Sequence, residues 1–554
     1  MKTRYIVLAL LAASVTVSCE KFLDTSLDLN ATGETVETNR GTIWSFANAF
    51  YSPIIYGYSV IDGNLFAAAS DEAQQTAASS NALYFNKGML NESLNPLWTY
   101  YNNCYEGIRA ANFFLDYVAD GKGIALLEKN RNLVTDAVNY ARDVRSLNYY
   151  IAEAHVARAY YYAELIKMYG GVPIVEQTQQ QSGGAFVPRS SYEACVEYIV
   201  NEIDSYKDQL AVNWDDDNTR EGRFTLGAAL AIKARVLLYA ASPLHNPTGD
   251  RAKWIRAAEA ARDVAMDPNL SYTLAGDYGA YFRGSNPLSS KETIYAVRRA
   301  ASNTMETNNY PIATSGGKSG VCPTENLVSA YEYIGEPDPE NPYANRDPRL
   351  AASIVTNGST WNGRVIAQAA GETDDQSRAN ASRTGYYLKK FLTDNLNLTQ
   401  GQTAQHNWVA YRFAEVLLNY AEAVNEAWGP STVPAGFPAS AAQALQYVRN
   451  RASMSLPPVD AQTVDSFRSA VKRERQVELA FEDHRYWDLL RWKDAMTVLN
   501  SPVKGVKVSR SGDTYTYKVV DVADRSFTAR NYYLPLMHSE IVNAAGTLEQ
   551  NPGY

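Results

Sequence analysis

The stretch RERQVELAFEDHRYWDLLRW, residues 473–492, carries the most information about the fold of this chain. On a helix that enters this stretch, one face is formed by Phe467, Ala470, Glu474, Val477 and Phe481. The pattern places the Glu474 carboxylate inside an apolar stripe, where an unpaired charge costs about 3 to 5 kcal/mol. We therefore expect a structural ion-pair network rather than an active site. The candidate partners are Arg475, Arg485 and Arg491.

Long helical blocks precede this stretch. Apolar positions recur in steps of three and four over 147–168, where Arg158 also lies on the buried face, and GlyGlyValPro follows at 170–173. The other long helices are predicted at 226–241, 408–427 and 467–481. Shorter amphipathic segments are predicted at about 98–118, 191–210, 252–266 and 438–453. Helix pairs of this size favour a mainly α fold with a tetratricopeptide-like stack.

Two regions have a different character, at about 270–400 and 500–554. They contain short strand-like runs, such as 293–297 and 514–520, separated by turn residues. Irregular segments of this length in a compact protein are usually functional. We expect them to form a loop-rich ligand face beside the helices.

The N-terminus has the pattern of a signal peptide, assigned to residues 1–18. Lys2 and Arg4 precede an apolar run of roughly 13 residues, which is shorter than the about 20 needed to span a bilayer. Cys19 follows and resembles a bacterial lipoprotein acceptor, although Thr16 stands where Leu is usual. Ordinary secretion is the alternative, and no later segment is long enough to be predicted as a transmembrane helix.

Composition excludes several classes of protein. The chain has 554 residues, 46% of them hydrophobic, so it can bury a large core. Its net charge of −9 argues against a nucleic-acid binder, which needs clustered Lys and Arg. The 39 tyrosines suit either a helical core or a ligand-stacking surface. The scattered Cys104, Cys195 and Cys322 have no metal spacing and are expected to be buried.

No cofactor, metal ion or catalytic group is expected. The run at 214–218 could offer oxygen ligands to calcium, but it lacks the glycine and distal glutamate of an EF-hand loop. A helical glycosidase is the enzyme alternative. Glu415 and Glu422 would lie about 10.5 Å apart along a helix, near the roughly 6.5 to 9.5 Å of inverting glycosidases. Such enzymes, however, usually take the two carboxylates from different elements.

Eight further motifs carry a family resemblance. They are CEKFLD (19–24), EAHVARAYYY (153–162), YGGVP (169–173), VPR (187–189), GRFT (222–225), RDPR (346–349), YRFAEVLLNYAEA (411–423) and the final QNPGY. With the stretch at 473–492, in which Asp483 replaces a usual Gly, they occur in the order found in SusD/RagB family proteins. The chain resembles these outer-membrane nutrient-binding lipoproteins over nearly its whole length.

The resemblance implies one SusD-like domain at 19–554, with loop-rich insertions at about 270–400 and 500–554. It also implies a cell-surface, lipid-anchored protein of the outer membrane that captures oligosaccharides for a SusC-like TonB-dependent β-barrel transporter. It implies no enzymatic activity. Peptide or other cargo on the same fold is the alternative function.

A sugar site needs flat apolar faces and side chains that bind hydroxyl groups. The loop at 70–95 and the irregular middle region, which holds Asn308, combine both kinds of residue. The predicted ligand-binding residues are Asp71, Gln75, Asn81, Tyr84, Phe85, Tyr310 and Trp361.

Overall fold

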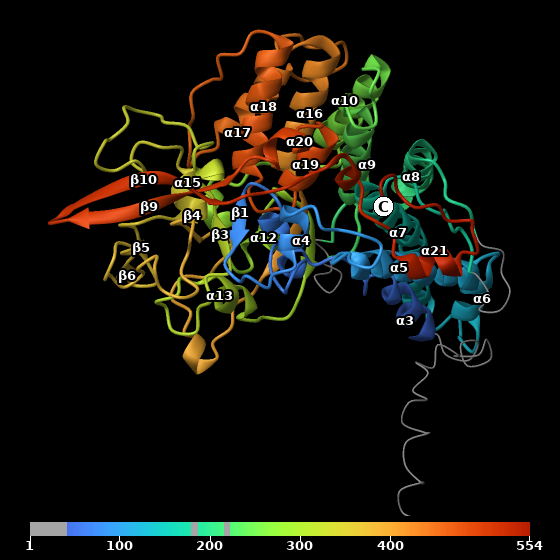
Figure 1. Cartoon of the computed structure of the whole chain (residues 1–554). Helices are drawn as coiled ribbons and strands as arrows, with labels where there is room; N and C mark the ends of the chain where they lie inside the picture. The colour runs from blue at the N-terminus through green and yellow to red at the C-terminus, as the bar shows by residue number, and fades with distance from the viewer. Residues whose placement is uncertain (1–40, 179–186, 215–221) are drawn as a thin grey trace, which may run out of the picture.

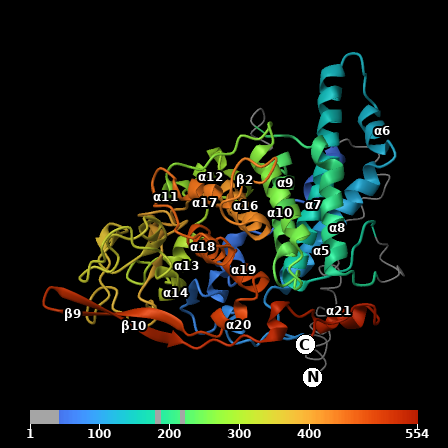
Figure 2. The same cartoon turned by 90° about the horizontal axis from the view of Figure 1, so that it is seen from above.

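The computed structural model describes residues 41–178, 187–214 and 222–554. Helices form one side of the molecule, and loops with short strands form the other (Figures 1 and 2). The main helices are α3 (Gly41–Ala49), α5 (Trp98–Val118), α6 (Lys122–Glu128), α7 (Ala137–Tyr169), α8 (Tyr192–Tyr206), α9 (Leu226–Ala241), α10 (Arg251–Met266), α16 (Phe413–Trp428), α17 (Ala441–Arg449) and α18 (Val464–Glu478). This confirms the mainly α fold. The signal peptide, Cys19 and residues 215–218 of the acidic run lie outside the described residues.

The helices pack in chain order, with α5 on α7, α7 on α8, α8 on α9, α9 on α10 and α10 on α16. Side-chain caps fix several starts, because Ser191, Thr225 and Asp250 each accept a hydrogen bond from a backbone N–H of the first turn. Gly107 lets α5 approach α7 closely, since a Cβ there would lie 2.2 Å from the Tyr161 ring. None of the described helices is long and apolar enough to cross a membrane.

One predicted helix is partly wrong. The segment expected at 408–427 begins as strand β8 (Asn407–Arg412), and α16 starts only at Phe413. The strand pairs antiparallel with β2 (Thr293–Arg298), which takes up its backbone hydrogen bonds. Tertiary pairing therefore overrides the helical spacing of Ala410 and Phe413.

The loop-rich side holds two-stranded pairings. Besides β2 and β8, they are β1 (Ala73–Gln75) with β3 (Val321–Pro323), β4 (Ile354–Val355) with β7 (Tyr387–Leu388), β5 (Thr360–Trp361) with β6 (Arg364–Val365), and β9 (Val503–Ser511) with β10 (Thr514–Ala523). The β9–β10 hairpin projects from the body (Figure 1). The remaining short helices are α4 (Ala82–Asn86), α11 (Tyr278–Tyr281), α12 (Asn286–Ser289), α13 (Thr304–Asn309), α14 (Glu325–Val328), α15 (Arg349–Ser353), α19 (Arg485–Arg491), α20 (Ala495–Val498) and α21 (His538–Asn543).

Tyrosines contribute heavily to the core. Fully buried examples are Tyr161, Tyr162, Tyr169, Tyr310, Tyr331, Tyr386, Tyr387 and Tyr411. Cys104, Cys195 and Cys322 are buried and free, as expected. Much of the tyrosine content therefore serves packing rather than ligand stacking.

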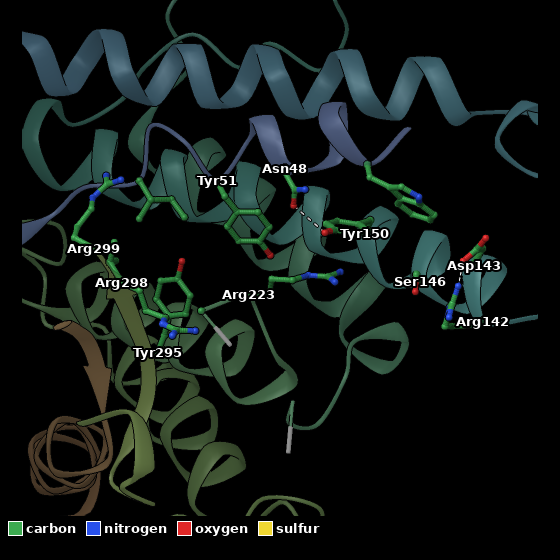
Figure 3. Close-up of a pocket in the computed structure, with 14 residues that line it drawn as sticks. Asn48, Tyr51, Arg142, Asp143, Ser146, Tyr150, Arg223, Tyr295, Arg298 and Arg299 are labelled. Atoms are coloured by element: carbon green, nitrogen blue, oxygen red, sulfur yellow. Dashed lines mark hydrogen bonds and ion pairs between the residues drawn. The ribbon is translucent and has the colours of Figure 1, made fainter. Parts of the chain in front are cut away.

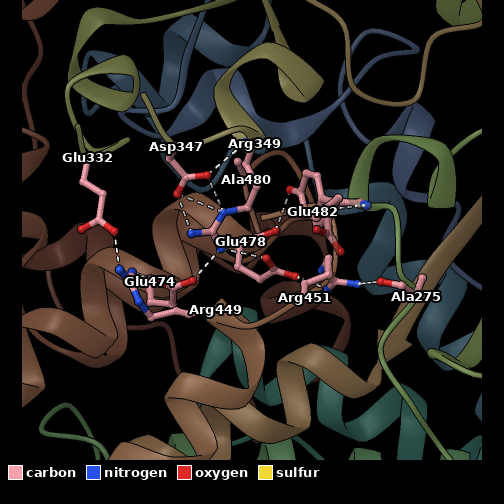
Figure 4. A network of polar contacts seen from close by, with 12 residues as sticks. Ala275, Glu332, Asp347, Arg349, Arg449, Arg451, Glu474, Glu478, Ala480 and Glu482 are labelled. Carbon is pink, nitrogen blue, oxygen red and sulfur yellow. Dashed lines mark hydrogen bonds and ion pairs between the residues drawn. The ribbon is translucent and has the colours of Figure 1, made fainter. Parts of the chain in front are cut away.

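The ion-pair network predicted around residues 473–492 is present and buried (Figure 4). Glu478 is fully buried and accepts hydrogen bonds from Arg349, Arg412 and Arg451 at 2.7 to 2.8 Å. Burial by itself raises the pKa of the Glu478 carboxyl. The three guanidinium groups outweigh burial and hold that pKa well below its usual value.

The predicted partners of Glu474 are wrong. Glu474 pairs with Arg349 at 2.5 Å and with Arg449 at 2.8 Å, both from distant segments. The three arginines named from the sequence pair elsewhere: Arg475 with Asp488, Arg485 with Asp71, and Arg491 with Glu422 and Asp488.

Two more buried cations are also paired with carboxylates. Arg158 pairs with Glu202 at 2.7 Å, which satisfies the charge predicted on the buried face of its helix. Lys390 pairs with Glu482 at 2.7 Å, and burial lowers the pKa of Lys390 to about 8 against the opposing effect of Glu482.

Replacing Glu478 by Gln should lower the free energy of unfolding by about 3 to 5 kcal/mol, because three buried guanidinium groups lose their shared negative charge. Chemical denaturation followed by circular dichroism measures the change. Glu259→Gln is the matched control, since this glutamate is exposed on α10 and should matter by less than about 0.5 kcal/mol. Equal stability of the two variants would contradict the network's role.

The stability of Glu478→Gln relative to wild type should depend on pH in a definite direction. A carboxyl whose folded-state pKa is depressed stabilises the fold above its unfolded pKa, near 4.5, and loses this contribution as the pH falls. The stability difference between wild type and Glu478→Gln should be constant from pH 8 to 6. It should narrow between about pH 4.5 and 3. Denaturation at each pH tests this, and a difference that widens in acid would oppose it.

Candidate functional site

A polar pocket of about 550 Å³ opens on the loop-rich side, between residues 62–80 and 308–320. We call it the polar pocket. Its lining consists of Asp62, Asn64, Gln75, Thr76, Ala77, Ser79, Ser80, Asn308, Ile312, Gly317, Lys318, Gly320 and Asn380. The set combines one carboxylate, four amides, three hydroxyls and one ammonium group, and contains no aromatic ring. Such groups bind hydroxyl-rich ligands through hydrogen bonds.

Residues 62–80 and 308–320 are joined by paired strands and by side-chain amides. Strand β1 pairs with β3 beside the pocket, and Thr76 donates its backbone N–H to Gly320 O at 2.9 Å. The Asn64 and Asn309 amides exchange two hydrogen bonds of 3.0 Å each. Asn308 donates to Gly63 O at 3.0 Å. These bonds hold the pocket walls in place before any ligand binds.

Asp62 organises the rim of the pocket. Its carboxylate accepts hydrogen bonds from the Ser80 hydroxyl at 2.6 Å, the Asn81 backbone N–H at 2.9 Å and the Asn81 amide at 2.6 Å. Asp62 has a φ of 52°, in the left-handed region that Asn and Asp tolerate better than most residues. The predicted residue Asn81 therefore belongs to the rim through Asp62.

Gln75 is the predicted residue that lines the polar pocket itself. Its side chain is 8% exposed, and its Oε1 has no hydrogen-bond partner among the described residues. The nearby Ser319 hydroxyl is also buried without a partner. Buried polar atoms normally find partners, so these two indicate hydrogen-bonding capacity that the protein itself leaves unused.

Two predicted residues near the pocket serve the scaffold. Asp71 is buried and makes two hydrogen bonds of 2.8 and 2.9 Å with Arg485. Burial raises the pKa of Asp71, but the Arg485 guanidinium outweighs it and holds that pKa below its usual value. Phe85 is 4% exposed and packs edge-on against Phe66 and Tyr486. Neither residue lines the polar pocket.

The predicted aromatic platforms of the middle region lie in the core. Tyr310 is 0% and Trp361 2% exposed, and their rings meet edge-on with centroids 6.4 Å apart. Neither ring offers a face to a ligand in this structure, because both are buried. The sequence pattern of the region does not show this burial. Tyr84 is half-buried on α4 and keeps part of its surface exposed, so ligand contact there stays a prediction.

Sequence reasoning missed Asp62, Lys318 and Asn380, which come from three loops. Lys318 and Asn380 are exposed, and Asn380 has a φ of 61°. The only available sequence signal was a polar residue in a turn, which is common in loops of every kind. Their convergence depends on the folded positions of the loops.

The two carboxylates of the glycosidase alternative are fully engaged elsewhere. Glu415 is 2% exposed and binds Arg235 at 2.6 and 2.7 Å. Glu422 is 4% exposed and binds Arg491 at 2.6 and 2.7 Å. Both carboxylates are therefore held as ion-pair partners of arginines, whereas an inverting mechanism needs one carboxyl protonated and the other free to activate a water.

Two family models match the chain. The model described as the SusD family matches residues 288–554. The model described as "Starch-binding associating with outer membrane" matches residues 21–238. The two matches do not overlap and together span most of the chain.

Individual relatives agree with these matches. SusD-like protein P2 of Formosa agariphila is 24% identical over 446 residues, 77% of each chain. A SusD-like protein of Bacteroides ovatus is 23% identical over 501 residues, 89% of this chain and 83% of the relative.

Solved structures share the fold. A SusD-like protein of Bacteroides fragilis superposes with a TM-score of 0.76 at 24% identity, covering 94% of this chain and 98% of the other. A SusD-like carbohydrate binding protein of the same species gives 0.74 at 23% identity, covering 93% and 99%.

Proposed function

Because the chain belongs to the SusD family, we propose that it is a cell-surface glycan-binding lipoprotein that captures oligosaccharides in the polar pocket. One observation carries this proposal: amides, hydroxyls, a carboxylate and an ammonium group converge from three loops held on a helical scaffold. One fold neighbour is itself described as a carbohydrate binding protein.

The chemistry of capture is hydrogen bonding. Asp62 and the amide oxygens can accept from sugar hydroxyls, and Lys318 and the amide nitrogens can donate to them. Since the lining holds no aromatic ring, ring stacking would have to come from residues beyond the pocket such as Tyr84. The unpartnered Gln75 Oε1 gains a donor only if its surroundings adjust when the sugar enters.

The proposal extends to location and partner. Association with the outer membrane is in the description of one matching family model. Anchoring through Cys19, exposure to the exterior and delivery to a SusC-like TonB-dependent β-barrel follow from the sequence resemblance. The proposed role includes no bond cleavage, so the bound sugar should be recovered unchanged.

Removing exposed pocket groups should weaken binding without unfolding the protein. We expect Lys318→Met combined with Asn380→Gly to lower affinity for the cognate oligosaccharide by about tenfold or more, since each lost hydrogen bond contributes roughly 0.5 to 1.5 kcal/mol and one to a charged group more. Glycine is chosen at 380 because φ is positive there. Calorimetry with oligosaccharides selected on a glycan array measures the change.

The matched control is Lys122→Met with Asn130→Gly, an exposed pair near α6 in which Asn130 also has a positive φ. It should bind like wild type. Wild-type affinity in the pocket variant would show that the sugar binds elsewhere. Binding of peptides but of no glycan would show that the alternative cargo, peptide, is the correct one.

The anchor has its own test. A single acyl chain gives only marginal membrane binding, with K on the order of 10⁴ M⁻¹, whereas several chains hold firmly. Cys19→Ala should therefore yield unprocessed or soluble protein in cell fractionation, while Cys104→Ala should stay in the membrane fraction because Cys104 is buried in the fold. Surface display and lipid labelling of the Cys19 variant would refute the anchor.

A further inference from the structure

A cavity of about 390 Å³ lies on the helical side of the molecule, where α10 packs on α16 and α16 packs on α18 (Figure 1). We call it the tryptophan pocket. It shares no lining residue with the polar pocket, nor with the cavity of about 510 Å³ between α3, α7 and β2 that Figure 3 shows. Its size lies within the range of small-molecule sites, roughly 300 to 1,000 Å³.

The walls of the tryptophan pocket are largely apolar. They are formed by Ala241 at the end of α9, Pro243 and Pro247 in the loop after it, Trp254 on α10 and Trp492 just after α19. The two tryptophans are mostly buried, with 8% and 6% of their surface exposed. Such walls favour a ligand with a compact apolar body.

The side-chain oxygens of the lining are already used by the protein. Both oxygens of Glu422 and both of Glu426 accept hydrogen bonds from arginine side chains at 2.5 to 2.7 Å. The Asn246 oxygen accepts one from the backbone N–H of Asp250 at 2.8 Å. A ligand rich in hydroxyl groups would have to share these acceptors.

Two donor groups of the lining have no acceptor within the part of the chain that the structure describes. The Trp492 indole N–H donates to Glu422 at 2.7 Å, whereas the Trp254 indole N–H, on a similarly buried ring, has no partner. Buried tryptophan N–H groups usually have one. The exposed Lys493 ammonium makes no hydrogen bond or ion pair with a described residue and lies 6.0 Å from the centroid of the Tyr532 ring.

Lys493 differs from the other two cations of the lining. Arg468 pairs with Glu426 at 2.5 Å, and Lys472 pairs with Asp494 at 2.6 Å. Lys493 also has a φ of 62°, which is uncommon for a residue other than glycine, asparagine or aspartate. Backbone conformations of this kind cluster at ligand sites. The unused groups are therefore one ammonium and one indole N–H, and both can only donate hydrogen bonds.

We infer that the tryptophan pocket is a second binding site, for small ligands that carry a carboxylate on an apolar or aromatic body. The carboxylate accepts charge-assisted hydrogen bonds from the Lys493 ammonium and from the Trp254 indole N–H, and the body packs against the apolar walls. A hydroxyl-rich sugar is not the expected ligand, so the inference does not rest on the proposed function. Binding should weaken as salt rises, because Lys493 is exposed.

The test uses phenylacetate as the probe, with phenylacetamide as its uncharged counterpart and glucuronate as its hydroxyl-rich counterpart. In NMR titrations of the whole protein at low salt, phenylacetate should bind at least about tenfold more tightly than either. Lys493→Met should weaken phenylacetate binding about tenfold, and Trp254→Phe, which keeps an aromatic ring, about fivefold. Lys493 is exposed, so the fold of its variant should be retained, with circular dichroism as the check.

Matched controls lie outside the tryptophan pocket. Lys518→Met on β10 and Trp44→Phe on α3 remove the same groups elsewhere and should leave phenylacetate binding unchanged. The polar-pocket variant Lys318→Met with Asn380→Gly should also leave it unchanged. No binding of phenylacetate, equal binding of either counterpart, or full affinity in Lys493→Met would each overturn the inference, whatever the outcome for neutral glycans.

Discussion

The buried Glu478 carboxylate joins three segments that lie far apart in the chain. Its carboxylate contacts guanidinium groups from α15, from the end of β8 and from the segment after α17. Arg412 and Arg451 also share Glu292, the residue just before β2, so the same cluster reaches the strand that pairs with β8. Each charge is buried, and none can lose its partners without a large cost. The network therefore fixes how the loop-rich side sits on the helices.

The polar pocket depends on this attachment. Asp71 and Glu72, just before β1, bind Arg485 and the backbone N–H of Phe481, which belong to the same C-terminal stretch. The other wall is tied through Glu306, which binds His406 and the backbone N–H of Thr393. Both walls are thus bonded to segments that lie far from the pocket in the sequence. Asp71, Glu72 and Glu306 are therefore structural carboxylates that position the loops.

The sequence predicted local features well and long-range partners poorly. Periodicity located α5 and α9 at their observed bounds, because repeated apolar spacing is a property of the helix itself. It predicted that Glu474 needed a partner, yet its partner Arg349 lies 125 residues away in the chain. Trp361 and Tyr310 were predicted on a surface and are buried, since a polar loop sequence does not show which of its rings turn inward. Asn81 was connected to the pocket only through Asp62, a residue that no pattern marked.

The one departure from the family pattern within 473–492, Asp483, is explained by its backbone conformation and its contact with a cation. Asp483 replaces a usual Gly and has a φ of 63°, so the backbone keeps the left-handed conformation that glycine adopts most easily. The replacement adds a half-buried carboxyl, and the loss of solvent around it raises the pKa of Asp483, with Lys167 opposing. Its Oδ1 accepts a hydrogen bond from Trp487 Nε1 at 3.2 Å, and its Oδ2 lies 3.6 Å from Lys167 Nζ. Lys167 on α7 already pairs with Glu164 at 2.6 Å, so the new charge enters a site that holds a cation. Lys167 thus lies between two carboxylates, of which Glu164 is the closer, and its contact with Asp483 again links the C-terminal stretch to the helical scaffold.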